Sequence, residues 1–285
     1  MRSNILLKKE FVQNIEFKKI ISQDLESSAM SLPTPAQKPA TVVGIERLLD
    51  IFEAFQLSQR PLSLTDLAEA ANIPKSTCHA IVATLSSRGY LYSLSRPRAL
   101  YPTKRMYDVA LDILKKDPFL ERATPLLERL RDTSRETVIL GKRQGDSVVY
   151  LQVIESLQSI RYSAKTGDIK PMHSSSIGKA LLGSLKETEL RHWLAEKPLP
   201  AITSSTITDP EKLADDILQS RQLGYFQTRG ENVSDVWAVS AFLKVDKETF
   251  AIAIAGPKHR MEASLPECAH LLVATCSFLS HTLCR

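Results

Sequence analysis

The stretch 62–103 constrains the fold of this chain most strongly, because its pattern predicts two short helices joined by a sharp turn. Ser63 is able to cap the first helix, and an aspartate three residues later suits the positive end of a helix. An Asn-Ile-Pro sequence at 72–74 interrupts the pattern, so a second helix is expected to begin at Pro74 or Lys75. In that helix, apolar residues recur at the spacing of a buried stripe, namely Cys78, Ile81, Val82 and Leu85.

The outward side chains near the start of the second helix are all polar or basic: Lys75, Ser76, Thr77 and His79. These types can hydrogen-bond to phosphates or to base edges in a DNA major groove. No Asp or Glu occurs between positions 70 and 107, whereas six Lys and Arg residues do. This segment of one charge sign predicts attraction to a polyanion, which the net charge of +5 over the whole chain does not by itself indicate.

A short basic hairpin is expected next, with strands at 90–92 and 99–101. Its turn carries Arg96 and Arg98, whose guanidinium groups can enter a minor groove or bind flanking phosphates. Taken alone, this turn can also be an ordinary solvated loop. Together, the helices and the hairpin predict a winged helix-turn-helix that binds double-stranded DNA through Lys75, Ser76, Thr77, His79, Arg96 and Arg98.

Length and composition indicate a globular chain of about two domains, with 285 residues of which 43% are hydrophobic and 24% charged. No apolar run approaches the roughly 20 residues that cross a bilayer, and the mixed charges of 1–30 argue against a secretory signal. The four cysteines lack CxxC spacing. We therefore interpret them as reduced residues of a cytoplasmic protein without a metal site or a membrane partner.

The chain is expected to have four regions: a disordered arm at 1–40, the winged helix-turn-helix at 41–103, a linker helix at 104–118 and a second domain at 119–285. Met30 offers an alternative start of translation within the arm. A helix ahead of the helix-turn-helix is predicted to pack on it through Ile45, Leu48, Leu49, Phe52 and Phe55. The linker helix either carries a dimer contact or is a simple spacer.

The second domain has an α+β pattern. Besides a helix that starts at the serines 174–176, helices are expected at 120–134, 187–194, 209–223 and 262–283. Strands are expected at 136–143, 147–153, 159–165, 225–228, 236–245 and 249–256. An antiparallel sheet flanked by helices follows from this order.

The loop 167–172 and the serine-capped helix after it form the best candidate for a small-molecule site. Successive amides at a helix start, together with hydroxyl groups, suit a carboxylate or another anion. The alternative, in which the serines 174–176 only cap the helix, fits the sequence equally well. A phosphate-binding P-loop does not fit, because Lys179 is followed by Ala180 rather than by Ser or Thr.

Catalytic groups do not assemble in the sequence. The histidines lack metal-ligand spacing, and no serine lies in a nucleophile-elbow context. An enzyme or sensor that uses Ser175, Ser176 and His173 in one pocket, without DNA, remains the alternative function. The main hypothesis is a non-enzyme with no catalytic residue, metal or cofactor.

The motifs at 63–68, 73–79 and 85–91 occur in order in the first half of the chain, and those at 172–182, 224–225 and 251–257 occur in the second half. Over 41–285 the chain thereby resembles the IclR (isocitrate lyase regulator) family of bacterial transcriptional regulators. The resemblance implies homodimers, which can pair into tetramers on operator DNA.

The resemblance also implies a GAF-like effector-binding domain for a small metabolite, often an organic or aromatic acid of a catabolic pathway. Operator affinity or promoter output would respond to this effector, and the regulator would more often be a repressor. By motif, ligand contacts carry over to Met172, Ser175, Ser176, Ile177, Val236, Ala238, Ala253 and Ala255.

Two of these positions, Ala253 and Ala255, depart from the family pattern, in which some members have serines that bind a carboxylate. A methyl group in place of a hydroxyl removes a polar partner for an acid. The pocket is therefore expected to prefer a more apolar or aromatic effector, bound mainly at the end formed by 174–177.

Overall fold

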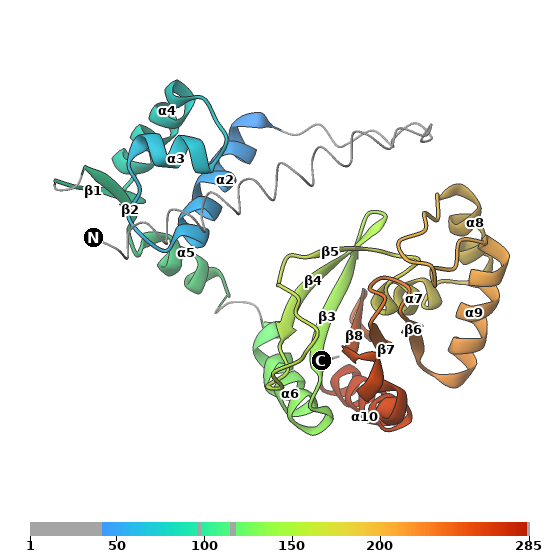
Figure 1. The fold of residues 1–285 in the computed structure, drawn as a ribbon. Coiled ribbons are helices and arrows are strands. Elements are labelled where there is room, and N and C mark those ends of the chain that lie inside the picture. The colour runs from blue at the N-terminus through green and yellow to red at the C-terminus, as the bar shows by residue number, and fades with distance from the viewer. Residues whose placement is uncertain (1–41, 96–97, 115–117, 284–285) are drawn as a thin grey trace. The chain divides into compact units, whose positions relative to one another are not determined.

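The computed structural model describes residues 42–95, 98–114 and 118–283 (Figure 1). The chain divides into two compact units, with the boundary between Ala110 and Leu111, inside helix α5 (Arg105–Leu114). The predicted arm 1–40 lies outside the described residues. Within the described part of the chain, no helix has the length and apolar character needed to cross a membrane.

The first unit contains three helices and a hairpin ahead of α5: α2 (Val43–Ser58), α3 (Leu64–Ala70), α4 (Lys75–Ser87), β1 (Leu91–Leu94) and β2 (Ala99–Pro102). The predicted start of α3 is confirmed, since the Ser63 hydroxyl accepts a hydrogen bond of 3.1 Å from the Asp66 amide. The Asp66 carboxylate accepts from the Ser63 amide in return, at 3.3 Å. The hairpin is antiparallel, as predicted.

The packing face predicted for α2 is wrong in part. Ile45 and Leu49 are each 56% exposed, whereas Ile51 and Ala54 are buried together with Phe55. The apolar stripe of α2 is wider than the face that contacts the rest of the unit. The helical spacing alone therefore assigned residues at the exposed edge of this stripe to the packing face. In α4 the predicted stripe is confirmed, because Cys78, Val82 and Leu85 are buried and Ile81 packs against them.

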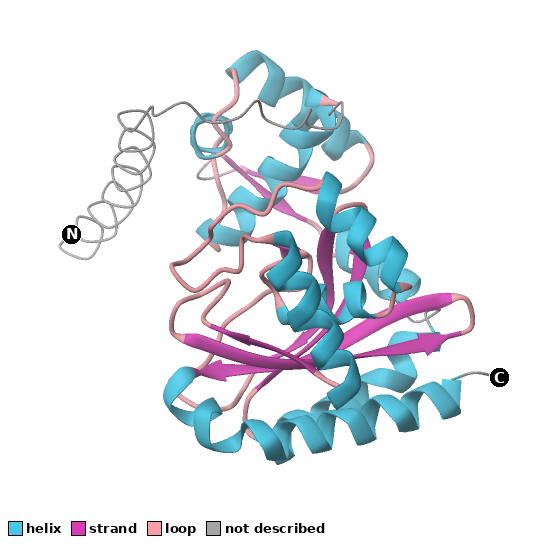
Figure 2. Cartoon of the chain, turned by 90° about the vertical axis from the view of Figure 1, so that its right-hand side faces the viewer, coloured by secondary structure: helices cyan, strands magenta, loops and turns pink. Residues whose placement is uncertain are grey.

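The second unit is a six-stranded antiparallel sheet between two helical layers (Figure 2). Its strands are β3 (Thr137–Gln144), β4 (Ser147–Ile154), β5 (Ile169–Pro171), β6 (Phe226–Arg229), β7 (Val236–Val245) and β8 (Glu248–Pro257), in the order β5-β4-β3-β8-β7-β6. Its helices are α6 (Pro118–Ser134), α7 (Ser176–Gly183), α8 (Glu187–Glu196), α9 (Pro210–Leu223) and α10 (Lys258–Leu283). Helices α6 and α10 cover one face, and α7 with α8 and α9 covers the other (Figure 1).

The strand predicted at 159–165 is absent, and β5 lies instead within the predicted loop 167–172. Strand β5 is defined by its pairing with β4, in which Ser147 lies opposite Pro171. The residues 155–168 are irregular and are fixed by side chains, including a hydrogen bond of 2.6 Å from the Thr137 hydroxyl to the Tyr162 carbonyl. Long-range pairing thus outweighed the local β pattern.

Successive side chains of strand β8 point alternately into two hydrophobic cores, one on each face of the sheet. Its alanines 251, 253 and 255 face the layer of α7, whereas Ile252 and Ile254 face α6 and α10. The small side chains leave space on the α7 side of the sheet, and the large ones fill the other side.

Candidate functional site

The start of α4 presents a polar surface. Lys75, Ser76 and His79 are exposed and Thr77 is half-buried, while Cys78 faces the core. No side chain caps the helix, and within the described residues the amides of 75–77 have no backbone hydrogen-bond partner. Free amides at a positive helix end, next to a lysine, suit a phosphate group.

The hairpin adds further positive charge to the first unit. Arg98 is exposed at its turn, and Arg96 lies outside the described residues. At its base, the Arg105 guanidinium stacks 5.2 Å from the Tyr90 ring centre. The nearby Lys104 makes a solvent-exposed pair of 3.4 Å with Asp108, which costs little to separate. This surface can therefore bind an anionic backbone.

A small cavity lies in the second unit, between the sheet and the start of α7. Its walls are Ile139, Tyr150, Tyr162, Ser175, Ser176, Thr228, Asn232, Val233, Val236, Ala238, Ala253 and Ala255. The volume that the centre of a water molecule can occupy inside this cavity is about 30 Å³. Since one water needs roughly 10–15 Å³ of such space, this form of the cavity admits only two or three waters.

Six of the eight residues predicted to contact a ligand line this cavity, namely Ser175, Ser176, Val236, Ala238, Ala253 and Ala255. The other two, Met172 and Ile177, are each 1% exposed and belong to the core beside it. Sequence reasoning missed the tyrosines, Thr228 and Asn232. Each lies on a different segment, so no local pattern brings these side chains together.

The serines at the start of α7 have separate contacts. The Ser175 hydroxyl accepts from the Gly178 amide at 3.1 Å and donates to the Pro171 carbonyl at 2.6 Å, so this residue caps the helix. The Ser176 hydroxyl lines the cavity and has no hydrogen-bond partner among the described residues. The amides of Ser176 and Ile177 likewise have no backbone partner there. These three donors can bind an oxygen atom of a ligand.

The polar groups of the cavity wall are neutral. Burial raises the pKa of Tyr150 well above its ordinary value, and a hydrogen bond with Tyr162 acts in the same direction. Tyr150 therefore stays a phenol that can donate or accept. No charged side chain is among the lining residues, so an anionic ligand would be bound by hydrogen bonds rather than by an ion pair.

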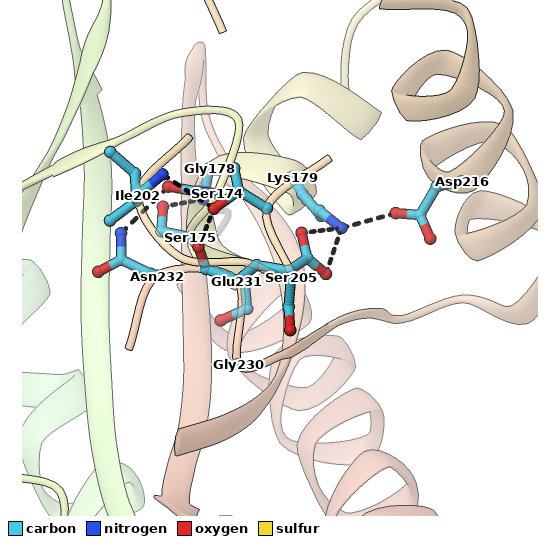
Figure 3. Close-up of polar contacts among 12 residues, drawn as sticks. Ser174, Ser175, Gly178, Lys179, Ile202, Ser205, Asp216, Gly230, Glu231 and Asn232 are labelled. Carbon is cyan, nitrogen blue, oxygen red and sulfur yellow. Dashed lines mark hydrogen bonds and ion pairs between the residues drawn. The ribbon is translucent and has the colours of Figure 1, made fainter. Parts of the chain in front are cut away.

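A buried ion cluster lies next to the cavity. The fully buried Lys179 ammonium is 2.8 Å from the Asp216 carboxylate and 2.8 Å from Glu231 Oε1 (Figure 3). It also lies 2.7 Å from Glu231 Oε2, at an angle that makes this an ion pair rather than a hydrogen bond. Burial raises the pKa of Glu231, an effect that the nearby ammonium opposes.

The residues of the enzyme alternative do not form a catalytic group. The His173 imidazole is buried, and its Nε2 lies 2.9 Å from the Pro200 carbonyl oxygen. Among the described residues it has no hydrogen bond with Ser175 or Ser176. Three cysteines are free and buried, Cys284 lies outside the described part, and no group of metal ligands occurs within that part.

Comparison with known proteins decides between the two functions. Residues 111–281 match the family described as "Bacterial transcriptional regulator IclR C-terminal", and residues 44–95 match "IclR helix-turn-helix domain". The chain belongs to the IclR family. It is therefore a DNA-binding transcriptional regulator and not an enzyme, and the predicted family is confirmed.

Characterised relatives extend over most of the chain. The HTH-type transcriptional regulator BhcR of Paracoccus denitrificans is 31% identical over 228 residues, which cover 79% of this chain and 81% of that protein. The transcriptional repressor IclR of Escherichia coli is 30% identical over 236 residues, covering 80% and 86% respectively. An IclR homologue from Microbacterium hydrocarbonoxydans, solved in complex with 4-hydroxybenzoate, shares the fold with a TM-score of 0.67 at 21% identity, covering 84% and 98%.

Proposed function

We propose that this regulator represses its target promoters and that a small aromatic or organic acid, bound in the cavity of the second unit, changes its affinity for operator DNA. The uncapped, acid-free start of α4 carries the DNA-binding part of the proposal. Lys75, Ser76, Thr77 and His79 would enter the major groove, and Arg98 with Arg96 would contact the flanking backbone or minor groove.

The effector chemistry follows from the cavity wall. The hydroxyl of Ser176 and the amides of Ser176 and Ile177 would bind the carboxylate, while the floor of Val236, Ala238, Ala253 and Ala255 would contact an apolar or aromatic body. Met172 would support the floor from the core. A solved relative that binds 4-hydroxybenzoate supports an acid of this class.

The space available means that an effector must move part of the wall, because an aromatic acid is larger than two or three waters. A ligand can change the conformational equilibrium only by binding two arrangements with unequal affinity. We propose that the arrangement that binds the effector differs from the compact one in its affinity for the operator.

We also propose that the regulator acts in the cytoplasm as a homodimer, which can pair into tetramers on DNA. Two helix-turn-helix units in a dimer would recognise the two half-sites of an operator. Helix α5 supports the dimer contact, because apolar side chains along it are exposed: Met106, Tyr107, Val109, Ile113 and Leu114. The domain limits that we propose are those expected from the sequence, with the winged helix-turn-helix at 41–103, the linker helix at 104–118 and a GAF-like second domain at 119–285.

The test is a fluorescence anisotropy titration against DNA upstream of the gene and its neighbours, with unrelated DNA as competitor. Specific binding that weakens with added salt, and that changes when 4-hydroxybenzoate is added, is the expected result. Binding that is equally strong on unrelated DNA, or that no acid of this class changes, would contradict the corresponding part of the proposal.

A further inference from the structure

Secondary structure determines which part of the cavity wall can move. Most lining residues belong to strands of one sheet or to α7, which are fixed by backbone hydrogen bonds. Tyr162 lies in the irregular 155–168 segment, where its carbonyl accepts a hydrogen bond from Thr137. Asn232 and Val233 belong to the 230–235 segment, which joins β6 to β7 outside the ladder. Displacement of this segment would enlarge the cavity without breaking the sheet.

The inner side of the 230–235 segment is held by α7. Glu231 is 7% exposed, and its carboxylate binds the ammonium of Lys179, which is 0% exposed. The next residue, Asn232, donates from its amide to the Ser174 hydroxyl at 3.1 Å. Figure 3 shows both contacts converging on the start of α7. The ion pair therefore fixes the segment directly beside the cavity.

The outer side of the segment is held by neutral groups. The Thr203 hydroxyl donates to the Gly230 carbonyl at 2.6 Å, and the Thr206 hydroxyl donates to the Glu231 carbonyl at 2.7 Å. Gly230 has a φ of +80°, and a β-carbon there would approach the Ser234 carbonyl oxygen to 2.7 Å. Gly230 thus allows the tight turn, and the two hydroxyls hold the carbonyls of Gly230 and Glu231, so the segment would open about this end when the inner contact separates.

Asp216 makes separation of the inner contact feasible. Removing the sole partner of a buried charge is costly, because the charge is left without a counter-ion away from water. Lys179, however, has a second carboxylate 2.8 Å away on α9, from Asp216, whose side chain is 32% exposed. When Glu231 moves outward, the ammonium keeps Asp216 as its counter-ion, and Glu231 gains solvent.

We propose that Glu231 is a positioning residue of the effector site, whose ion pair with Lys179 closes the 230–235 segment over the cavity. Asp216 retains Lys179 when the segment opens to admit the effector. The identity of the site as an effector site rests on the proposed function, whereas the closing contact itself does not.

Two matched variants test this inference in the full chain. Glu231→Gln and Asp216→Asn each remove one negative charge from the same ammonium, but only Glu231 belongs to the segment. Hydrogen exchange measured by mass spectrometry reports on amides that the closed segment protects, Gly230 N–H to Val236 O and Val236 N–H to Val233 O. We expect exchange over 230–236 to become at least tenfold faster in Glu231→Gln and to stay within twofold of the wild type in Asp216→Asn.

Titration calorimetry with 4-hydroxybenzoate as the probe then connects the segment to binding. If closing opposes binding, Glu231→Gln should bind the probe at least fivefold more tightly, while Asp216→Asn should bind within twofold of the wild type. Failure of all three proteins to bind this probe, with the exchange difference intact, would contradict the proposed acid class and support the closing contact.

Two results would overturn the inference. One is that residues 230–236 of Glu231→Gln exchange at the same rate as in the wild type. The other is that both variants exchange equally faster over 230–236, which would mean that the ion cluster stabilises the unit as a whole rather than closing the segment. If the glutamine variant does not fold, Glu231→Asp keeps the charge and shortens the side chain, and the same loosening is expected. Circular dichroism establishes the folded state of each variant first.

Discussion

A β-carbon at Gly178 would overlap the backbone carbonyl oxygen of Met172. The first turn of α7 therefore packs directly against the chain that leads into it, without a side chain between them. Ser175 closes the same turn by accepting from the Gly178 amide. This close contact fixes the direction of the amides that we propose bind the effector.

Replacing Gly178 by Ala should destabilise the second unit, because the methyl group meets backbone rather than a flexible side chain. Overpacking of this kind costs about 1–3 kcal/mol. Urea unfolding followed by circular dichroism measures the change. Gly44→Ala is the matched control, since a β-carbon at Gly44 in α2 would meet no other part of the protein within 4 Å and should be neutral or stabilising. Equal stability of Gly178→Ala and the wild type would contradict the close packing.

Replacing Lys75 by Ala should weaken operator binding and lower its salt dependence. If the ammonium binds one phosphate, the slope of log affinity against log salt should fall by about 0.9. Anisotropy titrations at several salt concentrations give this slope. Lys212 is a suitable control, because it is an exposed lysine on α9 of the other unit. A Lys75→Ala slope equal to that of Lys212→Ala would remove Lys75 from the DNA contacts.

Replacing Ala253 by Ser should raise the affinity for 4-hydroxybenzoate. The added hydroxyl would face the cavity and could donate to the carboxylate, a bond worth about 1.5–3 kcal/mol, or roughly tenfold or more in affinity. Ala251→Ser is the control, since Ala251 is on the same face of β8 but is not among the lining residues. Equal affinities of the two variants in calorimetry would argue against a ligand in this cavity.

His173 should make the stability of the second unit depend on pH. Burial lowers the pKa of its imidazole, so below about pH 6.5 the unfolded chain binds a proton that the folded chain does not. The free energy of unfolding should therefore decrease as the pH falls from 7 towards 5, with a slope of at most about 1.4 kcal/mol per pH unit.

His173→Gln keeps a donor for the Pro200 carbonyl and removes the titration. Urea unfolding at several pH values should give a shallower decrease for this variant than for the wild type. The same slope in both proteins would assign the pH dependence to other groups.

Local signals in the sequence predicted most of the regular elements. Asp209 and Gly224 enclose α9, and the structure confirms them as its caps, with a side-chain hydrogen bond at one end and a left-handed residue at the other. The limits of β7 were likewise predicted from its run of apolar residues. Such features depend on neighbours a few residues apart, which a single sequence contains.

The family resemblance supplied six residues that line the cavity, but other features that depend on distant segments were not predicted. Strand β5 exists through its register with β4, and the cavity wall joins Tyr150 and Tyr162 to Thr228 and Asn232 from separate segments. Lys179 gave no sign of burial, because its two carboxylates come from α9 and from the 230–235 segment. Tertiary packing decides each of these, and a pattern read along the chain does not contain it.

The alternation along β8 has a consequence for how this regulator can diversify. Its isoleucines complete the core with α6 and α10, whereas Ala253 and Ala255 line the cavity on the other face. If the cavity binds the effector as we propose, changes of size or polarity at 253 and 255 would alter the recognised molecule while the opposite core keeps its packing. Ligand preference and fold stability would then be encoded on alternate residues of one strand, so that new effectors would be acquired by single substitutions that leave the scaffold intact.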